Sequence, residues 1–279
     1  MLHVVIPVFN RRHYTRECLL VLRQQTRSDF RIVVVDDGST DGTDHMLAQD
    51  FPEVEVVTGT GHLFWTAGVN VGIRRALALG ASRIMTLNND VVPQPNFVAQ
   101  MLAAADRNPT ALLGPLELDV ATGQPIYGGE QLDWRTNTRH DLLARLPASE
   151  RHGLHAVTYL PGRGLLIPLA VIEAIGLFDE KRLPHYLSDY DYTSVARRHG
   201  FPVFCNHDAR LGTYPEESGQ EQTRRQRSLR GYYQHLFGIR GGGNLVNFTH
   251  FTLKNCPGPY LPYHLLNGYA RRLVGYFMH

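Results

Sequence analysis

Carboxylate and amide side chains gather in short runs of the 279-residue chain, and each run could do chemistry or only shape a turn. The run Asp36–Asp41 follows an apolar segment, and its Asp and Gly residues are good formers of a β-to-α turn. The run Asn88–Asp90 could cap a helix, but a carboxylate there could also hold a hard divalent cation. Such a cation is usually coordinated by one or two carboxylates together with the phosphates of a substrate.

A third run, Ser188–Asp191, stands inside a segment that is predicted to be helical. Ser188 and Asp191 fit the S-x-x-D pattern of a capping box, which would give Asp191 a structural role. Asp189 would then lie in the first helical turn, where the helix dipole favours an ionised carboxylate that can accept a proton.

The elements that would position these runs alternate between strand and helix. Strands are predicted at residues 2–8, 30–35, 54–57, 83–87 and 201–205, and helices at 11–25, 66–79, 97–105 and 183–200. This alternation implies a parallel sheet covered on both faces, and ligands of such sheets gather at the carboxyl ends of the strands. Asn10, Asp36 and Asp90 each follow such an end.

The second half of the chain is less regular. Residues 112–167 contain turns and short strands and predict an added antiparallel section. Beyond Glu216 the chain is polar and basic, and Gly241–Gly243 precedes an aromatic tail at 260–279. The tail predicts an amphipathic helix from the spacing of Leu265, Leu266, Tyr269, Leu273 and Phe277. Packing on the rest of the chain or on a second copy is the favoured interpretation, and attachment to a membrane surface is the alternative.

Composition narrows the class of protein. Hydrophobic residues make up 43% and charged residues 19% of the chain, as in globular domains. A formal net charge of +2 argues against a nucleic-acid-binding protein, which normally carries a large basic excess. Three widely separated cysteines predict neither a disulfide framework nor a zinc site and fit a reducing compartment. The N-terminus does not resemble a signal peptide, and no apolar run is long enough to span a bilayer.

Two common phosphate-binding loops are absent from the sequence. There is no GxxxxGK[ST] motif, and Gly59–Gly61 lacks the third glycine of a dinucleotide fingerprint. A different set of segments is present, in the order VVIPVFNRRHY, VVVDDGSTDGT, LFWTAGVNVGI, LNNDVVPQPNF and LPHYLSDYDYTSVARRHG. Together they resemble the ordered motifs of family 2 glycosyltransferases, over residues 3 to 210. The likeness is greatest to the rhamnosyltransferase-like branch, which builds bacterial surface polysaccharides.

The resemblance implies an α/β protein with the GT-A fold. We expect a Rossmann-like, mostly parallel sheet with flanking helices and a small antiparallel section, followed by a C-terminal helical extension. The expected catalytic domain covers residues 1–215, with a nucleotide-binding half at 1–110 and an acceptor-binding half at 111–215. The extension covers 216–279.

The resemblance also implies residues that bind the nucleotide of the donor. Asp36 would accept a hydrogen bond from the imide N–H of uracil or thymine, which cytosine cannot offer. Small residues near Gly68 would let backbone amides approach the ribose or the diphosphate. The expected nucleotide-binding set is Pro7, Val8, Asn10, Asp36, Ser39, Gly68, Asn70 and Asn89.

The metal motif departs from the family. Its usual Asp-x-Asp is Asn88–Asp90 here, so only the final carboxylate, Asp90, remains. One Asp together with the diphosphate suffices in principle to hold Mg²⁺ or Mn²⁺. His207 follows a predicted strand at the point where family members often place a histidine near the metal or diphosphate. We therefore expect Asp90 and His207 as metal ligands.

The expected reaction is inverting transfer of a sugar from a UDP- or dTDP-sugar to a hydroxyl of a glycan or lipid-linked acceptor. Asp189 aligns with the general base and Asp191 is the alternative, while Ser188 replaces the glutamate that usually precedes the base. A catalytically inactive nucleotide-sugar-binding or scaffold protein is the second hypothesis, and a nucleotidyltransferase the third. We expect a cytoplasmic protein that could meet the inner face of the membrane through its C-terminal tail and could form a homodimer.

Overall fold

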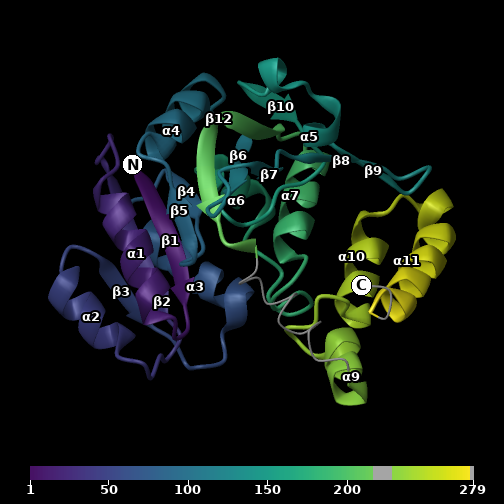
Figure 1. Cartoon of the computed structure of the whole chain (residues 1–279), viewed down its shortest axis with the longest axis horizontal. Helices are drawn as coiled ribbons and strands as arrows, with labels where there is room; N and C mark the ends of the chain where they lie inside the picture. The colour runs from purple at the N-terminus through teal and green to yellow at the C-terminus, as the bar shows by residue number, and fades with distance from the viewer. Residues whose placement is uncertain (216–227, 277–279) are drawn as a thin grey trace.

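The computed structural model describes residues 1–215 and 228–276 (Figure 1). Within these ranges, ten strands form one mixed sheet, in the order β10-β12-β6-β11-β4-β1-β2-β3, with β5 on β12 and β7 on β6. The strands are β1 (Leu2–Val8), β2 (Phe30–Asp36), β3 (Glu55–Thr58), β4 (Arg83–Thr86), β5 (Val91–Pro93), β6 (Leu112–Asp119), β7 (Pro125–Tyr127), β10 (Leu154–Ala156), β11 (Leu165–Pro168) and β12 (Val203–Thr213).

Helices cover the sheet and extend beyond it (Figure 1). They are α1 (Arg12–Arg23), α2 (Thr43–Asp50), α3 (Phe64–Ala78), α4 (Phe97–Arg107), α5 (Leu142–Arg145), α6 (Leu169–Ile175), α7 (Ser188–Arg198), α9 (Leu229–Phe237), α10 (Leu245–Asn255) and α11 (Leu261–Gly275). A separate antiparallel pair is formed by β8 (Glu130–Asp133) and β9 (Thr138–Asp141).

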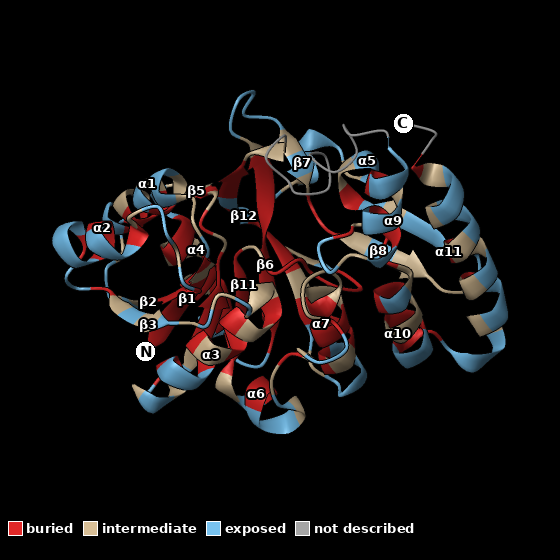
Figure 2. Ribbon diagram, turned by 90° about the horizontal axis from the view of Figure 1, so that it is seen from below, coloured by how far each residue is buried: buried red, intermediate tan, exposed pale blue. Residues whose placement is uncertain are grey.

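The sheet has a core on each face because strand side chains alternate in direction. Val4 and Ile6 of β1 belong to the core with α1, α2 and α4, whereas Val5 belongs to the core with α3, α6 and α7. Both cores are fully buried beneath helices that expose their outer surfaces (Figure 2). The expected α/β architecture with a mostly parallel sheet is confirmed.

Three sequence-based boundaries differ from the structure. The strand predicted at 201–205 runs on to Thr213, because it pairs in parallel with β6 on both sides of a bulge between Asn206 and Arg210. The helix predicted from residue 183 begins only at Ser188. The segment 112–167 is not wholly an antiparallel addition, since β6 is a buried strand of the main sheet.

The C-terminal extension is helical where the structure describes it. Helix α11 agrees with the amphipathic helix predicted in the tail, although Phe277 lies outside the described residues, as does the start of the extension at 216–227. Helix α10 packs between α7 and α11 (Figure 1). No helix in the described ranges has both the length and the apolar character needed to cross a membrane.

Candidate active site

The carboxyl ends of β1, β2 and β4 meet at one edge of the sheet, since these strands are parallel neighbours. A cleft of about 820 Å³ opens there, within the size range of small-molecule sites. Its first wall, contributed by the nucleotide-binding half, includes Pro7, Val8, Arg11, Asp37, Asn89 and Asp90. The opposite wall includes Gly162, Arg163, Tyr186 and Asp189.

Three of the expected nucleotide-binding residues form a hydrogen-bonded group beside the first wall. The backbone N–H of Asn10 donates to Ser39 Oγ (2.7 Å), and Asn10 Oδ1 accepts from the N–H of Thr40 (2.9 Å). Asp36 is buried and accepts from the N–H of Ser39 (2.9 Å). The structure therefore brings Asn10, Asp36 and Ser39 together as a brace between the ends of β1 and β2, whereas Pro7, Val8 and Asn89 line the cleft itself.

Asp37, which we did not single out, lies on the cleft where we expected Asp36. Its two carboxylate oxygens accept backbone N–H groups of Gly61 (2.7 Å) and Leu63 (2.8 Å). These bonds hold the loop before α3 against the end of β2. The doubled aspartate in the run Asp36–Asp41 was the available signal.

Asp90 is the member of its run that offers a carboxylate to the cleft. Asn88 Oδ1 accepts from Trp65 Nε1 (3.0 Å), and Asn89 Nδ2 donates to Thr15 Oγ1 (2.9 Å), so both amides are engaged with the protein. Asp90 Oδ2 pairs with a guanidinium nitrogen of Arg11 at 2.6 Å, and its side chain is 19% exposed.

These residues fit a divalent cation only together with a phosphorylated ligand. Among residues 1–215 and 228–276, no group of three or more His, Cys, Asp or Glu side chains is arranged to hold a metal ion. Asp90 supplies one hard oxygen donor, and a diphosphate in the cleft would supply others, which is a common arrangement for Mg²⁺.

His207 does not line the cleft. Because β12 continues past Cys205, His207 lies within the strand, fully buried, and its Nε2 is 2.7 Å from the carbonyl oxygen of Gly128. Its ring packs against that of His155, with centroids 4.2 Å apart and planes tilted by 39°. Burial lowers the pKa of His207. The expected role of His207 as a metal ligand is therefore corrected to a packing role.

Gly68 and Asn70 of α3 also lie behind the cleft wall. A Cβ atom on Gly68 would come 3.1 Å from Pro7 Cβ, so this glycine permits close packing of α3 on β1. Asn70 is 1% exposed, and its amide bonds to both backbone groups of Phe178 (2.9 and 3.0 Å) and to Glu180 (2.6 Å). Asn70 therefore holds the loop before α7, and it does not line the cleft.

Asp189 lies at the start of α7 and lines the cleft. The N–H of Gly162 donates to its Oδ2 (2.8 Å), and the N–H of Tyr190 to its Oδ1 (2.9 Å). Burial raises the pKa of Asp189, while these amides and the nearby Arg163 guanidinium act to lower it, and the net shift is upward. A carboxylate in this position is oriented and is more basic than an ordinary aspartate.

Asp191, the alternative base, faces away from the cleft. It is 2% exposed and accepts from Lys254 Nζ (2.6 Å) and Asn255 Nδ2 (2.8 Å) of α10. The predicted capping box is wrong, because α7 begins at Ser188 itself, and Ser188 Oγ accepts from Thr66 Oγ1 (2.9 Å). Asp191 is thus an anchor for the extension and is not available as a base.

A buried acid supports the opposite wall. Glu117 is 1% exposed, and neither of its carboxylate oxygens accepts a hydrogen bond, but Oε2 lies 3.0 Å from a guanidinium nitrogen of Arg163. Burial raises the pKa of Glu117, and the charge of Arg163 opposes that shift. The signal in the sequence was an isolated acid inside the apolar segment of β6, which we overlooked.

The C-terminal extension contributes a third side to the cleft, which sequence reasoning missed. Gln234, Arg240, Asn244 and Asn247 line it. The guanidinium carbon of Arg240 lies 5.8 Å from the ring centroids of both Phe9 and Phe64. Asn247 Nδ2 is buried without a hydrogen-bond partner. His185 also lines the cleft, and its burial, together with the charge of Arg240, lowers its pKa to about 4. The signal in the sequence was the glycine run Gly241–Gly243, which directly follows Arg240.

The family model described as Glycosyl transferase family 2 matches residues 3–152, which is more than half of the chain. The chain belongs to glycosyl transferase family 2. It is 28% identical over 218 residues to an N-acetylglucosaminyl-diphospho-decaprenol L-rhamnosyltransferase of Mycobacterium tuberculosis, covering 68% of each chain. It is 25% identical to an uncharacterised protein of the same species, covering 76% of this chain and 74% of that one.

Solved structures show the same fold for this family 2 member. S. aureus TarS (1-349) superposes with a TM-score of 0.60 at 15% identity, covering 99% of this chain and 88% of that one. GalNAc-T7, solved with UDP, GalNAc and Mn²⁺, superposes with a TM-score of 0.63 at 13% identity, covering all of this chain and 56% of that one. The family supports a glycosyl transfer role for this chain, and its cleft has Asp90 on one wall and Asp189 on the other.

Proposed function

We propose that this chain is an inverting glycosyltransferase that transfers a sugar from a UDP- or dTDP-sugar to a hydroxyl of a glycan or lipid-linked acceptor in surface polysaccharide synthesis. The observation that carries the proposal is the cleft that has Asp90 on one wall and an oriented, half-buried Asp189 on the other. The relative named as a rhamnosyltransferase acting on a diphospho-decaprenol acceptor supports the acceptor class.

The donor nucleotide would lie along the first wall. Pro7 and Val8 would contact the base and ribose, with Asn10, Asp36, Ser39 and Asn89 shaping that wall. Asp36 would accept from the imide N–H of the base through Oδ2, since the N–H of Ser39 occupies only Oδ1. Asp90 would hold Mg²⁺ or Mn²⁺ with the diphosphate, and when bound this cation neutralises charge on the leaving group. Arg11 and Arg163 would add positive charge on the two sides of the cleft.

Asp189 would act as the general base. It would accept the proton of the acceptor hydroxyl as that oxygen attacks the anomeric carbon, in a single displacement that inverts configuration. Hydrogen bonds from the backbone of Gly162 and Tyr190 keep the carboxylate aimed, and its raised pKa strengthens it as a base. Positioning of the two substrates in one cleft would supply much of the remaining rate.

A non-catalytic nucleotide-sugar-binding or scaffold protein is the second candidate. The Arg11–Asp90 ion pair favours it, because a cation from the protein already lies beside the single carboxylate of the metal motif. The replacement of the usual glutamate by Ser188 points the same way.

One assay separates the two candidates. The full chain is incubated with UDP-, dTDP- and GDP-sugars, with Mn²⁺ or with EDTA, and release of free nucleoside diphosphate is measured. Metal-dependent release from one donor is expected and would identify the nucleotide and the sugar. The scaffold would be favoured by two results together. The donor would raise Tm equally with and without the metal, and no nucleoside diphosphate would be released in the presence of glycan or lipid-linked acceptors.

The proposed location is the cytoplasm, with the extension able to meet the inner face of the membrane or a second copy of the chain. The extension, residues 216–279, includes seven Arg and one Lys against three Glu, and this basic excess suits an anionic lipid surface. Helix α11 also exposes apolar side chains, among them Leu266 at 72%. Flotation with anionic vesicles tests the membrane, and the mass in solution tests the dimer.

A further inference from the structure

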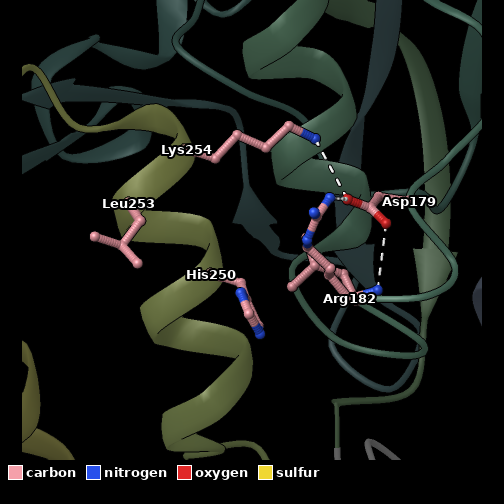
Figure 3. A pocket seen from close by; sticks show the side chains of 6 residues that line it. Asp179, Arg182, His250, Leu253 and Lys254 are labelled. Atoms are coloured by element: carbon pink, nitrogen blue, oxygen red, sulfur yellow. Dashed lines mark hydrogen bonds and ion pairs between the residues drawn. The ribbon is translucent and has the colours of Figure 1, made fainter.

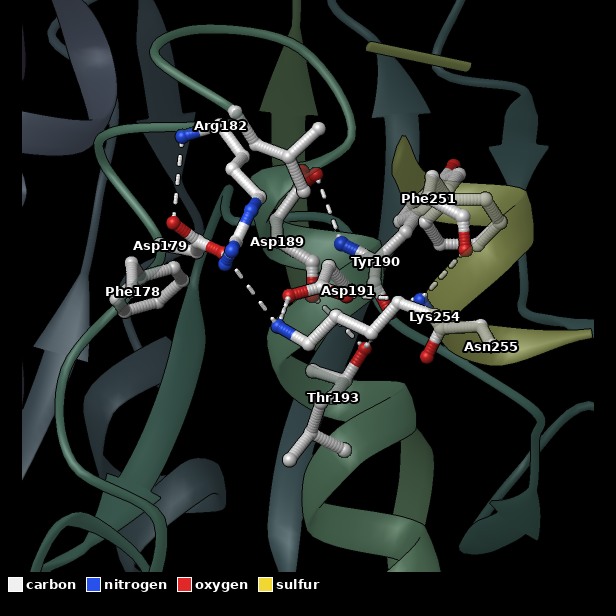
Figure 4. A network of polar contacts seen from close by, with 12 residues as sticks. Phe178, Asp179, Arg182, Asp189, Tyr190, Asp191, Thr193, Phe251, Lys254 and Asn255 are labelled. Carbon is white, nitrogen blue, oxygen red and sulfur yellow. Dashed lines mark hydrogen bonds and ion pairs between the residues drawn. The ribbon is translucent and has the colours of Figure 1, made fainter. Parts of the chain in front are cut away.

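Two acids in the first turn of α7 point in different directions. Asp189 lines the cleft, whereas Asp191 contacts α10 of the extension (Figure 4). Two residues correspond to about 200° around a helix, so neighbouring acids spaced in this way face opposite sides. A displacement of Asp191 would therefore also displace the helical turn that carries the proposed base.

The contact between α10 and Asp191 is short and charged, and it joins the buried Asp191 to a Lys254 side chain that is 38% exposed. Lys254 Nζ lies 2.6 Å from Asp191 Oδ2, and Asn255 Nδ2 lies 2.8 Å from Oδ1, so both carboxylate oxygens are held. Arg198, at the end of α7, also donates to Asn255 Oδ1. Helix α10 thus holds α7 at both its first and its last turn.

Lys254 also joins the loop that precedes α7. Its Nζ lies 3.8 Å from Asp179 Oδ2, and Asp179 pairs with Arg182 as well (Figure 3). A cavity of about 230 Å³ lies beside this contact, between α10 and the loop, lined by these three residues together with Leu183, His250 and Leu253. The cavity interrupts the packing between α10 and this loop.

Loss of the ammonium group would leave Asp191 buried with one neutral partner. An unpaired buried carboxylate is strongly destabilising, so the first turn of α7 would move to bring it towards water. The same movement would disturb the bond between Gly162 N–H and Asp189, which depends on the position of that turn. A misplacement of about 1 Å, even from a mutation far from the reacting atoms, can lower the rate about 10²-fold.

We infer that α10 of the C-terminal extension positions the general base, with Lys254 and Asn255 acting as positioning residues for Asp189 through Asp191. The inference rests on the proposed function.

The test uses the full chain and three lysine variants. Lys254→Met is expected to lower kcat for sugar transfer about tenfold or more, an activation free-energy change of about 1.4 kcal/mol or more, while KM for the donor stays within about twofold. Lys254→Arg, which can still pair with Asp191, is expected to recover most of kcat. Lys181→Met, at an exposed lysine of the neighbouring loop, is the matched control and is expected to behave like the wild type.

A folded Lys254→Met protein with wild-type kcat would overturn the inference, and so would equal losses in Lys254→Arg and Lys254→Met. If Lys254→Met does not fold, Asp191→Asn, which keeps the shape of the side chain, takes its place, and an unchanged kcat in that variant would also overturn it. Failure of the proposed function itself looks different, because the wild-type chain would then release no nucleoside diphosphate with any donor and acceptor.

Discussion

The two walls of the cleft are built in different ways. The first wall comes from the ends of adjacent parallel strands, β1, β2 and β4, so it is assembled from segments that carry their polar residues just after an apolar run. The opposite wall combines the loop at Gly162 with the start of α7, and the extension around Arg240 adds a third side, and these parts are far apart in the sequence. The first wall follows from local pattern, whereas the second exists only after long-range packing.

Among single substitutions, the largest loss of kcat is expected on the opposite wall. Asp189→Asn should lower kcat by about 10²–10⁴-fold, the usual contribution of a general base, because the amide cannot accept the proton. Binding of the donor, measured by titration calorimetry, should change little, since the first wall is intact. Near-normal turnover of Asp189→Asn would remove this residue from the role of base.

On the first wall, Asp90→Asn should abolish the metal-dependent part of donor binding. The expected readout is loss of the rise in Tm that Mn²⁺ produces in the presence of UDP, with turnover reduced about tenfold or more, roughly 1.4 kcal/mol of binding or activation free energy. Asp44→Asn, at an exposed acid in α2, is the matched control. An undiminished Mn²⁺ effect in Asp90→Asn would mean that other groups hold the cation.

The pH dependence of kcat should follow the ionisation of Asp189 on the opposite wall. Because the pKa of Asp189 is raised, mainly by burial, kcat should fall on acidification at a higher pH than for an ordinary aspartate. The charge of Arg163 opposes that shift, so Arg163→Gln should raise the pKa further and move the acid limb of the kcat profile to still higher pH. A limb that stays in place, or moves down, would show that Asp189 does not control the rate.

The smallest catalytic effect is expected behind the walls, at Asn70. Asn70→Ala removes the partners of two buried backbone groups of Phe178 and should lower the free energy of unfolding by about 1–3 kcal/mol. At temperatures where the variant is folded, KM for the donor should change less than about twofold if Asn70 acts only on packing. A selective rise in donor KM, without loss of stability, would return Asn70 to the nucleotide-binding set.

Two expected site residues lie away from the cleft, for two different physical reasons. His207 was placed after a strand because the apolar run stops at Cys205, but pairing with β6 continues through a bulge and carries the strand to Thr213. Asn70 looked available because polar residues near a binding motif often contact the ligand, yet a partner more than 100 positions away, Phe178, takes up its amide. Neither partner can be read from local spacing.

By itself, the sequence determined the alternating strands and helices, the polar ends of β1, β2 and β4, and the placement of Asp189 near the start of a helix. These features follow from periodicity and turn chemistry, which act over a few residues. Only the tertiary structure decided that Asp191 pairs with Lys254, that Glu117 supports Arg163, and that the extension closes one side of the cleft. Those contacts depend on how packed helices and strands place residues tens to hundreds of positions apart, and no local pattern encodes that placement.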